Sequence, residues 1–114
     1  MADKRAAPRI PPFVAPCRVA LGDRRFAGYL TDLSLRGGRV SCEEDPPVVG
    51  DPLVLEVRFR RTVAYSRLPC QVRWVRPQAG GGHVFGLAFQ GSGADLHAVE
   101  AVLEEFQRRA AELT

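Results

Sequence analysis

The chain has 114 residues, a formal net charge of +3 and an apolar content of 46%, values that fit one globular domain with its own core. No apolar run approaches the roughly 20 residues that a membrane span needs, and the N-terminus has no apolar segment of the secretory type. Because no other targeting pattern is visible, we expect a bacterial, cytoplasmic protein.

Residues 1–12 are polar, charged and proline-rich, so we expect a flexible N-terminal arm there and a folded domain over 13–114. Short apolar runs follow, separated by Gly, Pro and Asp, and several alternate with the two-residue period of a strand. This pattern predicts an antiparallel barrel or sandwich, and closure into a barrel would remove exposed strand edges. The expected strands are 13–21, 24–33, 37–42, 53–59, 68–76 and 83–90.

Two of these runs also predict which side chains share a face. In 53–59 the odd-numbered positions are apolar, and Glu56 falls on the opposite face. In 68–76 one face is predicted to carry Cys70, Val72 and Trp74.

The end of the chain changes to a helical period, which predicts a helix over about 93–112. Its apolar residues form one stripe, and we expect this stripe to pack on the barrel. The stripe consists of Leu96, Val99, Leu103, Phe106 and Ala110.

The three cysteines, Cys17, Cys42 and Cys70, are far apart and lie in apolar or strand-like runs, as buried free thiols do. No Cys/His pair has zinc-ligand spacing, so neither a metal nor a cofactor is expected. His83 and His97 lack any catalytic motif context, and no nucleophile is paired with a base. We therefore expect no catalytic residues and no enzymatic activity.

The stretch "TDLSLRGGRV" (31–40) is a candidate binding site. Asp32 and Ser34 are two residues apart, so on an extended chain they point to the same side, and Gly37 and Gly38 permit a close backbone approach. A carboxylate can accept hydrogen bonds from a guanine edge, and a hydroxyl with free backbone N–H groups can hold a phosphate oxygen. A turn in which Asp and Ser cap their own backbone explains the same residues, and it is the preferred interpretation when this stretch is taken alone.

The N-terminal arm carries a second candidate element, because "RAAPR" places Arg5 and Arg9 four residues apart. Arginine binds guanine or phosphate in a bidentate manner. A solvated basic tail is the alternative interpretation.

Together, "RAAPR" (5–9) and "DLSLRG" (32–37) resemble the signature of the PilZ domain family, RxxxR followed by [D/N]xSxxG. "QVRWV" (71–75) is similar to the family's V-x-W-V strand, and "HVFGLAF" (83–89) to its closing strand. The resemblance covers nearly the whole chain. It implies a mainly β fold, a six-stranded antiparallel barrel of the split-barrel type with a C-terminal helix.

The resemblance also implies a receptor for the second messenger cyclic di-GMP. Arg5 and Arg9 would grip guanine and phosphate, and Asp32 would read a guanine edge. Lys4 and Arg36 are possible additional contacts, since they flank the two motifs. The ligand-binding residues that the resemblance implies are Arg5, Arg9, Asp32, Ser34, Gly37 and Gly38.

Three functions are weighed on this basis. The preferred one is a stand-alone cyclic di-GMP effector, monomeric or homodimeric, that relays the signal to another protein in motility, pili, exopolysaccharide synthesis or development. The alternative is an adaptor of the same family that acts through protein contacts without nucleotide. Nucleic-acid binding by the arginines is disfavoured, because a net charge of +3 is low for that role.

Overall fold

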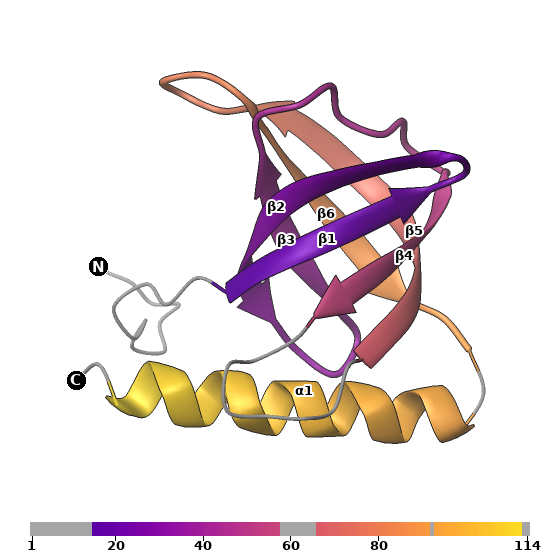
Figure 1. Cartoon of the computed structure of the whole chain (residues 1–114), viewed down its shortest axis with the longest axis vertical. Helices are drawn as coiled ribbons and strands as arrows, with labels where there is room; N and C mark the ends of the chain where they lie inside the picture. Colours follow the sequence, from indigo (N-terminus) through magenta and orange to yellow (C-terminus); the bar gives the residue numbers. More distant parts are fainter. Residues whose placement is uncertain (1–14, 58–65, 92, 113–114) are drawn as a thin grey trace, which may run out of the picture.

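The structure, a computed structural model, describes residues 15–57, 66–91 and 93–112, and this part of the chain consists of six strands and one helix (Figure 1). The elements are β1 (Ala15–Leu21), β2 (Arg24–Leu33), β3 (Gly37–Cys42), β4 (Pro52–Val57), β5 (Ser66–Pro77), β6 (His83–Phe89) and α1 (Gly93–Glu112).

The strands form a closed barrel in the order β1-β2-β3-β6-β5-β4, in which every neighbouring pair is antiparallel. A two-residue turn joins β1 to β2, and its Gly22 has a φ of 61°, which glycine adopts without a steric penalty. Pairing between β1 and β4 closes the sheet, so the barrel leaves no open edge. The predicted six-stranded antiparallel barrel with a C-terminal helix is confirmed, and the sandwich alternative is excluded.

The inward side chains of the strands fill the barrel with one apolar core. Phe85, Leu30, Leu55 and Leu68 are fully buried there. Phe26 meets Phe85 edge to face, with the ring centroids 6.4 Å apart. The core follows from the two-residue period, because alternate residues of each strand face the barrel axis.

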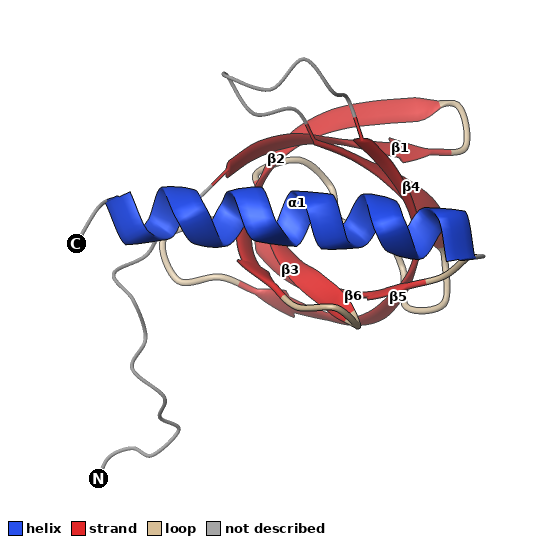
Figure 2. Cartoon of the chain, turned by 90° about the horizontal axis from the view of Figure 1, so that it is seen from below, coloured by secondary structure: helices blue, strands red, loops and turns tan. Residues whose placement is uncertain are grey.

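Helix α1 lies across one end of the barrel, as the view along that end shows (Figure 2). Val99 and Leu103 pack against the core as predicted. Val102 lies outside the predicted stripe but is only 3% exposed, so the buried face of the helix is wider than the stripe. In residues 15–57, 66–91 and 93–112, no helix is long and apolar enough to cross a membrane.

The prediction that Trp74 shares a face with Val72 is wrong. The register between β5 and β6 shifts between these two residues, so Trp74 lies opposite Gly86 and Val75 lies opposite the buried Phe85. A bulge of this kind inserts one residue and reverses the alternation that follows it. Trp74 therefore lies on the outer surface of the barrel, and Val75 takes the inward position.

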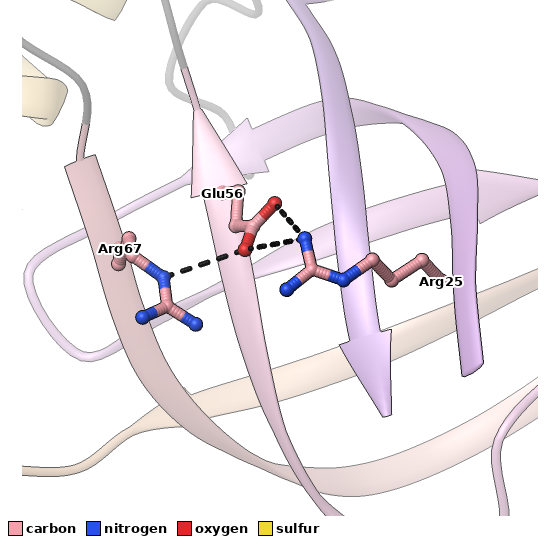
Figure 3. Close-up of polar contacts among 3 residues, drawn as sticks. All are labelled: Arg25, Glu56 and Arg67. Atoms are coloured by element: carbon pink, nitrogen blue, oxygen red, sulfur yellow. Dashed lines mark hydrogen bonds and ion pairs between the residues drawn. The ribbon is translucent and has the colours of Figure 1, made fainter. Parts of the chain in front are cut away.

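Glu56 lies on the outer face, as its position in the alternation predicts, yet it is only 4% exposed. Arg25 on β2 and Arg67 on β5 flank it, and each places a guanidinium nitrogen 3.3 Å from a carboxylate oxygen (Figure 3). The two long side chains cover the carboxylate while their own guanidiniums stay half exposed. The burial of Glu56 is thus produced by residues of other strands.

Cys17, Cys42 and Cys70 are free thiols buried in the barrel, as predicted. Burial in apolar surroundings raises the pKa of Cys17 and of Cys70 from 9.0 to about 12, because the thiolate is poorly solvated there.

The raised thiol pKa values predict that the barrel loses stability in alkali. In the unfolded chain the thiols ionise near pH 9.0, whereas in the folded protein Cys17 and Cys70 keep their protons up to about pH 12. The free energy of unfolding should therefore fall between these two pH values, by about 1.4 kcal/mol per thiol per pH unit. Urea unfolding at stepped pH measures this slope. Cys70→Ala should show a shallower decline above pH 9, and parallel curves for the two proteins would contradict the assignment.

Candidate functional site

Four strands contribute one residue each to a single line across the outer face of the barrel. The β-sheet register places Asp32 (β2) opposite Arg39 (β3), Arg39 opposite Gly86 (β6), and Gly86 opposite Trp74 (β5). Directly opposed residues of neighbouring strands share a face and lie closest to one another. The fold therefore brings together a carboxylate, a guanidinium and an indole that are up to 42 positions apart in sequence.

This line forms the floor of an open hollow of about 540 Å³, which is within the range of small-molecule clefts, about 300–1,000 Å³. The hollow is lined by Asp32, Ser34, Arg36, Gly37, Gly38, Arg39, Arg73, Trp74, Leu87 and Ala88.

The turn between β2 and β3 forms one wall and is held by its own hydrogen bonds. The backbone N–H of Ser34 donates to the carbonyl oxygen of Gly37 (2.8 Å), and its Oγ accepts from the backbone N–H of Arg36 (3.2 Å). The backbone N–H of Phe89 donates to the carbonyl oxygen of Arg36 (2.8 Å), which ties the turn to β6. Because the backbone of Arg36 is fixed in this way, its exposed side chain can face the hollow without disturbing the turn.

Gly37 is required by a close backbone contact and not by its own dihedral angles. A Cβ atom at this position would lie 1.8 Å from the carbonyl oxygen of Leu87 on β6. That oxygen belongs to a paired strand and cannot swing aside as a side chain can. The glycine of "DLSLRG" thus allows β3 to approach β6 at the rim of the hollow.

Asp32 is 58% exposed at its side chain and points outward. Its Oδ1 accepts a hydrogen bond from the backbone N–H of Leu33 (2.9 Å), and its Oδ2 lies 3.9 Å from Nη2 of Arg39. One oxygen is therefore oriented by the backbone. The other faces the hollow beside a guanidinium, where it can accept hydrogen bonds from a ligand.

Trp74 lies flat over the backbone of Gly86. A Cβ atom on Gly86 would come within 2.1 Å of the indole Nε1, so only glycine leaves room for the ring. On its other side, the guanidinium of Arg76 stacks over the indole at 4.7 Å from the ring centroid. The partly exposed indole therefore offers a ligand its edge, and stacking of a nucleobase on the ring requires Arg76 to move aside.

The side chains around the hollow are predominantly cationic. Arg36, Arg39 and Arg73 line it, against the one carboxylate of Asp32. Arginine offers a planar set of donors that matches phosphate oxygens. The combination of three guanidiniums, one carboxylate and an indole can bind phosphate, a guanine edge and a purine ring.

All predicted site residues in the described part of the chain line this hollow, namely Asp32, Ser34, Gly37 and Gly38, with Arg36. Lys4, Arg5 and Arg9 lie outside the residues that the structure describes.

Sequence reasoning missed Arg39, Arg73 and Trp74. A tight hairpin around "SLRG" already pairs Asp32 with Arg39, so hairpin register was a usable signal for that residue. The bulge in β5 decides on which face Arg73 and Trp74 lie, and the alternation of apolar and polar residues does not predict this bulge. In the described ranges, no group of three His, Cys, Asp or Glu residues is arranged to hold a metal ion.

The closed antiparallel barrel with a helix across one end and an arginine-lined hollow on its wall defines a small β-barrel domain. The family model of the PilZ domain matches residues 3–106. The chain belongs to the PilZ domain family, as the resemblance of its motifs indicated.

Two solved structures share the fold. The PilZ domain of YcgR from Escherichia coli, solved with c-di-GMP, has a TM-score of 0.71 and 21% sequence identity, covering 93% of this chain and 89% of that one. The PilZ domain of CeSA from a cellulose-synthesizing bacterium has a TM-score of 0.66 and 19% identity, covering 85% of this chain and 96% of that one. No curated protein sequence matches the chain significantly.

The packing of Trp74 on Gly86 predicts that Gly86→Ala displaces the indole. The new methyl group overlaps the ring, so the ring must leave the strand surface, while the strand pairing can persist. Trp74 is the single tryptophan of the chain, so its fluorescence emission reports this movement directly. We expect a shifted emission maximum and a stability loss of about 1–3 kcal/mol.

Gly22→Ala is the control for a loss of stability that does not touch the indole. Its Cβ atom meets no atom within 4 Å, while the φ of 61° makes alanine strained there. It should leave the emission maximum unchanged. Identical emission from wild type and Gly86→Ala would refute the packing.

Proposed function

We propose that the chain is a cyclic di-GMP receptor that acts by binding. The observation that carries the proposal is the meeting of the "DLSLRG" turn with Arg39, Arg73 and Trp74 in one hollow. The YcgR PilZ domain, which shares the fold, was solved with this nucleotide.

The chemistry of cyclic di-GMP matches the groups around the hollow. Its guanine Watson–Crick edge offers N–H donors, and the outward oxygen of Asp32 accepts such bonds. Its two phosphates suit the guanidiniums of Arg36, Arg39 and Arg73, and one purine suits the indole of Trp74 once it displaces the guanidinium of Arg76. Ser34 holds the turn in shape through its hydrogen bonds with Gly37 and Arg36.

Arg5 and Arg9 are proposed to bind the ligand from the segment that precedes β1. Ala15 pairs with Leu30, two residues before Asp32, so this segment enters the barrel beside the strand that carries the carboxylate. Arg9 lies six residues before Ala15, a length that spans at most about 20 Å. Lys4 would add a further charge near the phosphates.

The bound nucleotide is proposed to pass its signal to a downstream protein, in motility, pili, exopolysaccharide synthesis or development. The effector is proposed to be cytoplasmic and monomeric or homodimeric. Within the described residues, the site contains no arrangement of nucleophile and base, so the proposed action is binding alone.

One observation favours the alternative of an adaptor that does not bind nucleotide. Ser34 and Asp32 both form hydrogen bonds within their own turn, and Gly37 is required by β6, so the signature residues also have a structural explanation. The two functions differ in whether the outward oxygen of Asp32 binds anything.

Titration calorimetry with cyclic di-GMP distinguishes the receptor from the adaptor. We expect saturable binding by the wild type, and Asp32→Ala and Arg5→Ala should each weaken it by about 10- to 100-fold, because each removes a charge-assisted hydrogen bond. Asp23→Ala and Arg108→Ala change the same charges on the β1–β2 turn and on α1, and should bind like the wild type. Wild-type protein that shows no heat of binding would support the adaptor. Equal affinities for Asp32→Ala and Asp23→Ala would show that Asp32 does not bind the ligand and would contradict the proposed site.

A further inference from the structure

A second group of charged side chains lies outside the hollow, around Glu56. Nη1 of Arg25 lies 3.4 Å and 3.3 Å from the two carboxylate oxygens of Glu56, and Nε of Arg67 lies 3.3 Å from Oε2. The Glu56 side chain is 3% exposed, while those of Arg25 and Arg67 are 57% and 54% exposed. A nearly buried carboxylate on β4 therefore lies between two half-exposed guanidiniums, one from β5 on one side and one from β2 on the other.

Stability alone does not account for this group. Removing a carboxylate from water is costly, and an apolar residue on a strand often stabilises a fold as well as a buried ion pair does. The carboxylate instead fixes the positions of two flexible arginine side chains on the outer wall of the barrel. Figure 3 shows the terminal nitrogens of Arg67 directed away from Glu56, where an incoming group can reach them.

The surroundings of the group have the composition of a protein interface. Arg18 lies directly opposite Glu56 on β1 and is exposed, and Ala27 beside it has only a small side chain. Tyr29 follows on the same face of β2 and is 51% exposed. Arginine and tyrosine are the residue types that most often dominate binding energy at protein interfaces.

The group and the hollow lie on opposite sides of the barrel. The hollow is centred on the adjacent strands β3 and β6, and Glu56 is on β4 next to β1. In the closed order β1-β2-β3-β6-β5-β4, these two pairs of strands face each other across the core. One side can therefore bind a ligand while the other contacts a partner.

We propose that this surface, the Glu56 face (Arg18, Arg25, Tyr29, Glu56 and Arg67), is a docking site for an acidic segment of a partner protein. Aspartate or glutamate side chains of the partner bind the outward donors of the guanidiniums that Glu56 holds. Docking at the Glu56 face does not depend on nucleotide binding. It gives the proposed effector a surface through which it contacts a downstream protein.

Charge distribution favours an acidic protein segment over a nucleic acid. A phosphate backbone requires a continuous track of positive charge, and the Glu56 face has a carboxylate at its centre.

Fluorescence anisotropy with a labelled oligoglutamate peptide and the full chain tests the proposal. Arg25→Gln and Arg67→Gln should each weaken peptide binding about threefold, and the double variant about tenfold. Arg108→Gln removes the same charge from α1 and should bind like the wild type. Equal loss in Arg67→Gln and Arg108→Gln would mean that net charge alone attracts the peptide, and would overturn the proposal.

Two further measurements keep the result independent of folding defects. Arg67→Lys keeps the charge beside Glu56 but lacks the planar fork, so it should fold normally and still weaken the peptide. In wild-type amide NMR spectra, the peptide should shift Arg18, Glu56 and Arg67 and leave residues 34–38 unchanged. Shifts confined to 34–38, or tighter binding of single-stranded DNA of equal charge at the Glu56 face, would overturn the proposal.

Discussion

Closure of the six-stranded sheet through the pairing of β1 with β4 is the constraint on which the rest of this structure depends. Once every strand has two neighbours, alternate side chains must point either into one shared core or outward. The inward set gives the barrel Val40 and Phe85, which are fully buried. The outward set is arranged in lines that cross several strands, and one such line joins Asp32 to Trp74.

Two glycines shape the hollow along that line. Gly37 lets the backbone of β3 approach the Leu87 carbonyl, and Gly86 makes room for the indole of Trp74. At both positions a Cβ atom would overlap a neighbouring group, so the absence of a side chain is what allows the hollow to form. The glycine of "DLSLRG" thus has a structural reason in this PilZ domain, beside any contact with a ligand.

The sequence predicted the architecture well, because barrel strands and an end helix follow from local periodicity. It also located the turn that carries Asp32, since that motif is contiguous. The wrong or missing predictions share one cause. The alternation of residues within a single strand does not show how that strand pairs with its neighbours or which of their side chains cover it. The bulge in β5 moved Trp74 to the outer face, and the burial of Glu56 depends on arginines from β2 and β5. The residues that complete the site are likewise assembled by pairing across the sheet.

The line across β2, β3, β6 and β5 is the proposed binding surface for cyclic di-GMP, and an amide chemical-shift map with and without the nucleotide tests this proposal most directly. The largest changes are predicted at Asp32, Arg39 and Trp74, including the indole N–H, while Arg18 and Glu56 on the far side of the barrel stay in place. Unchanged spectra, or changes centred on Arg18 and Glu56, would contradict the account.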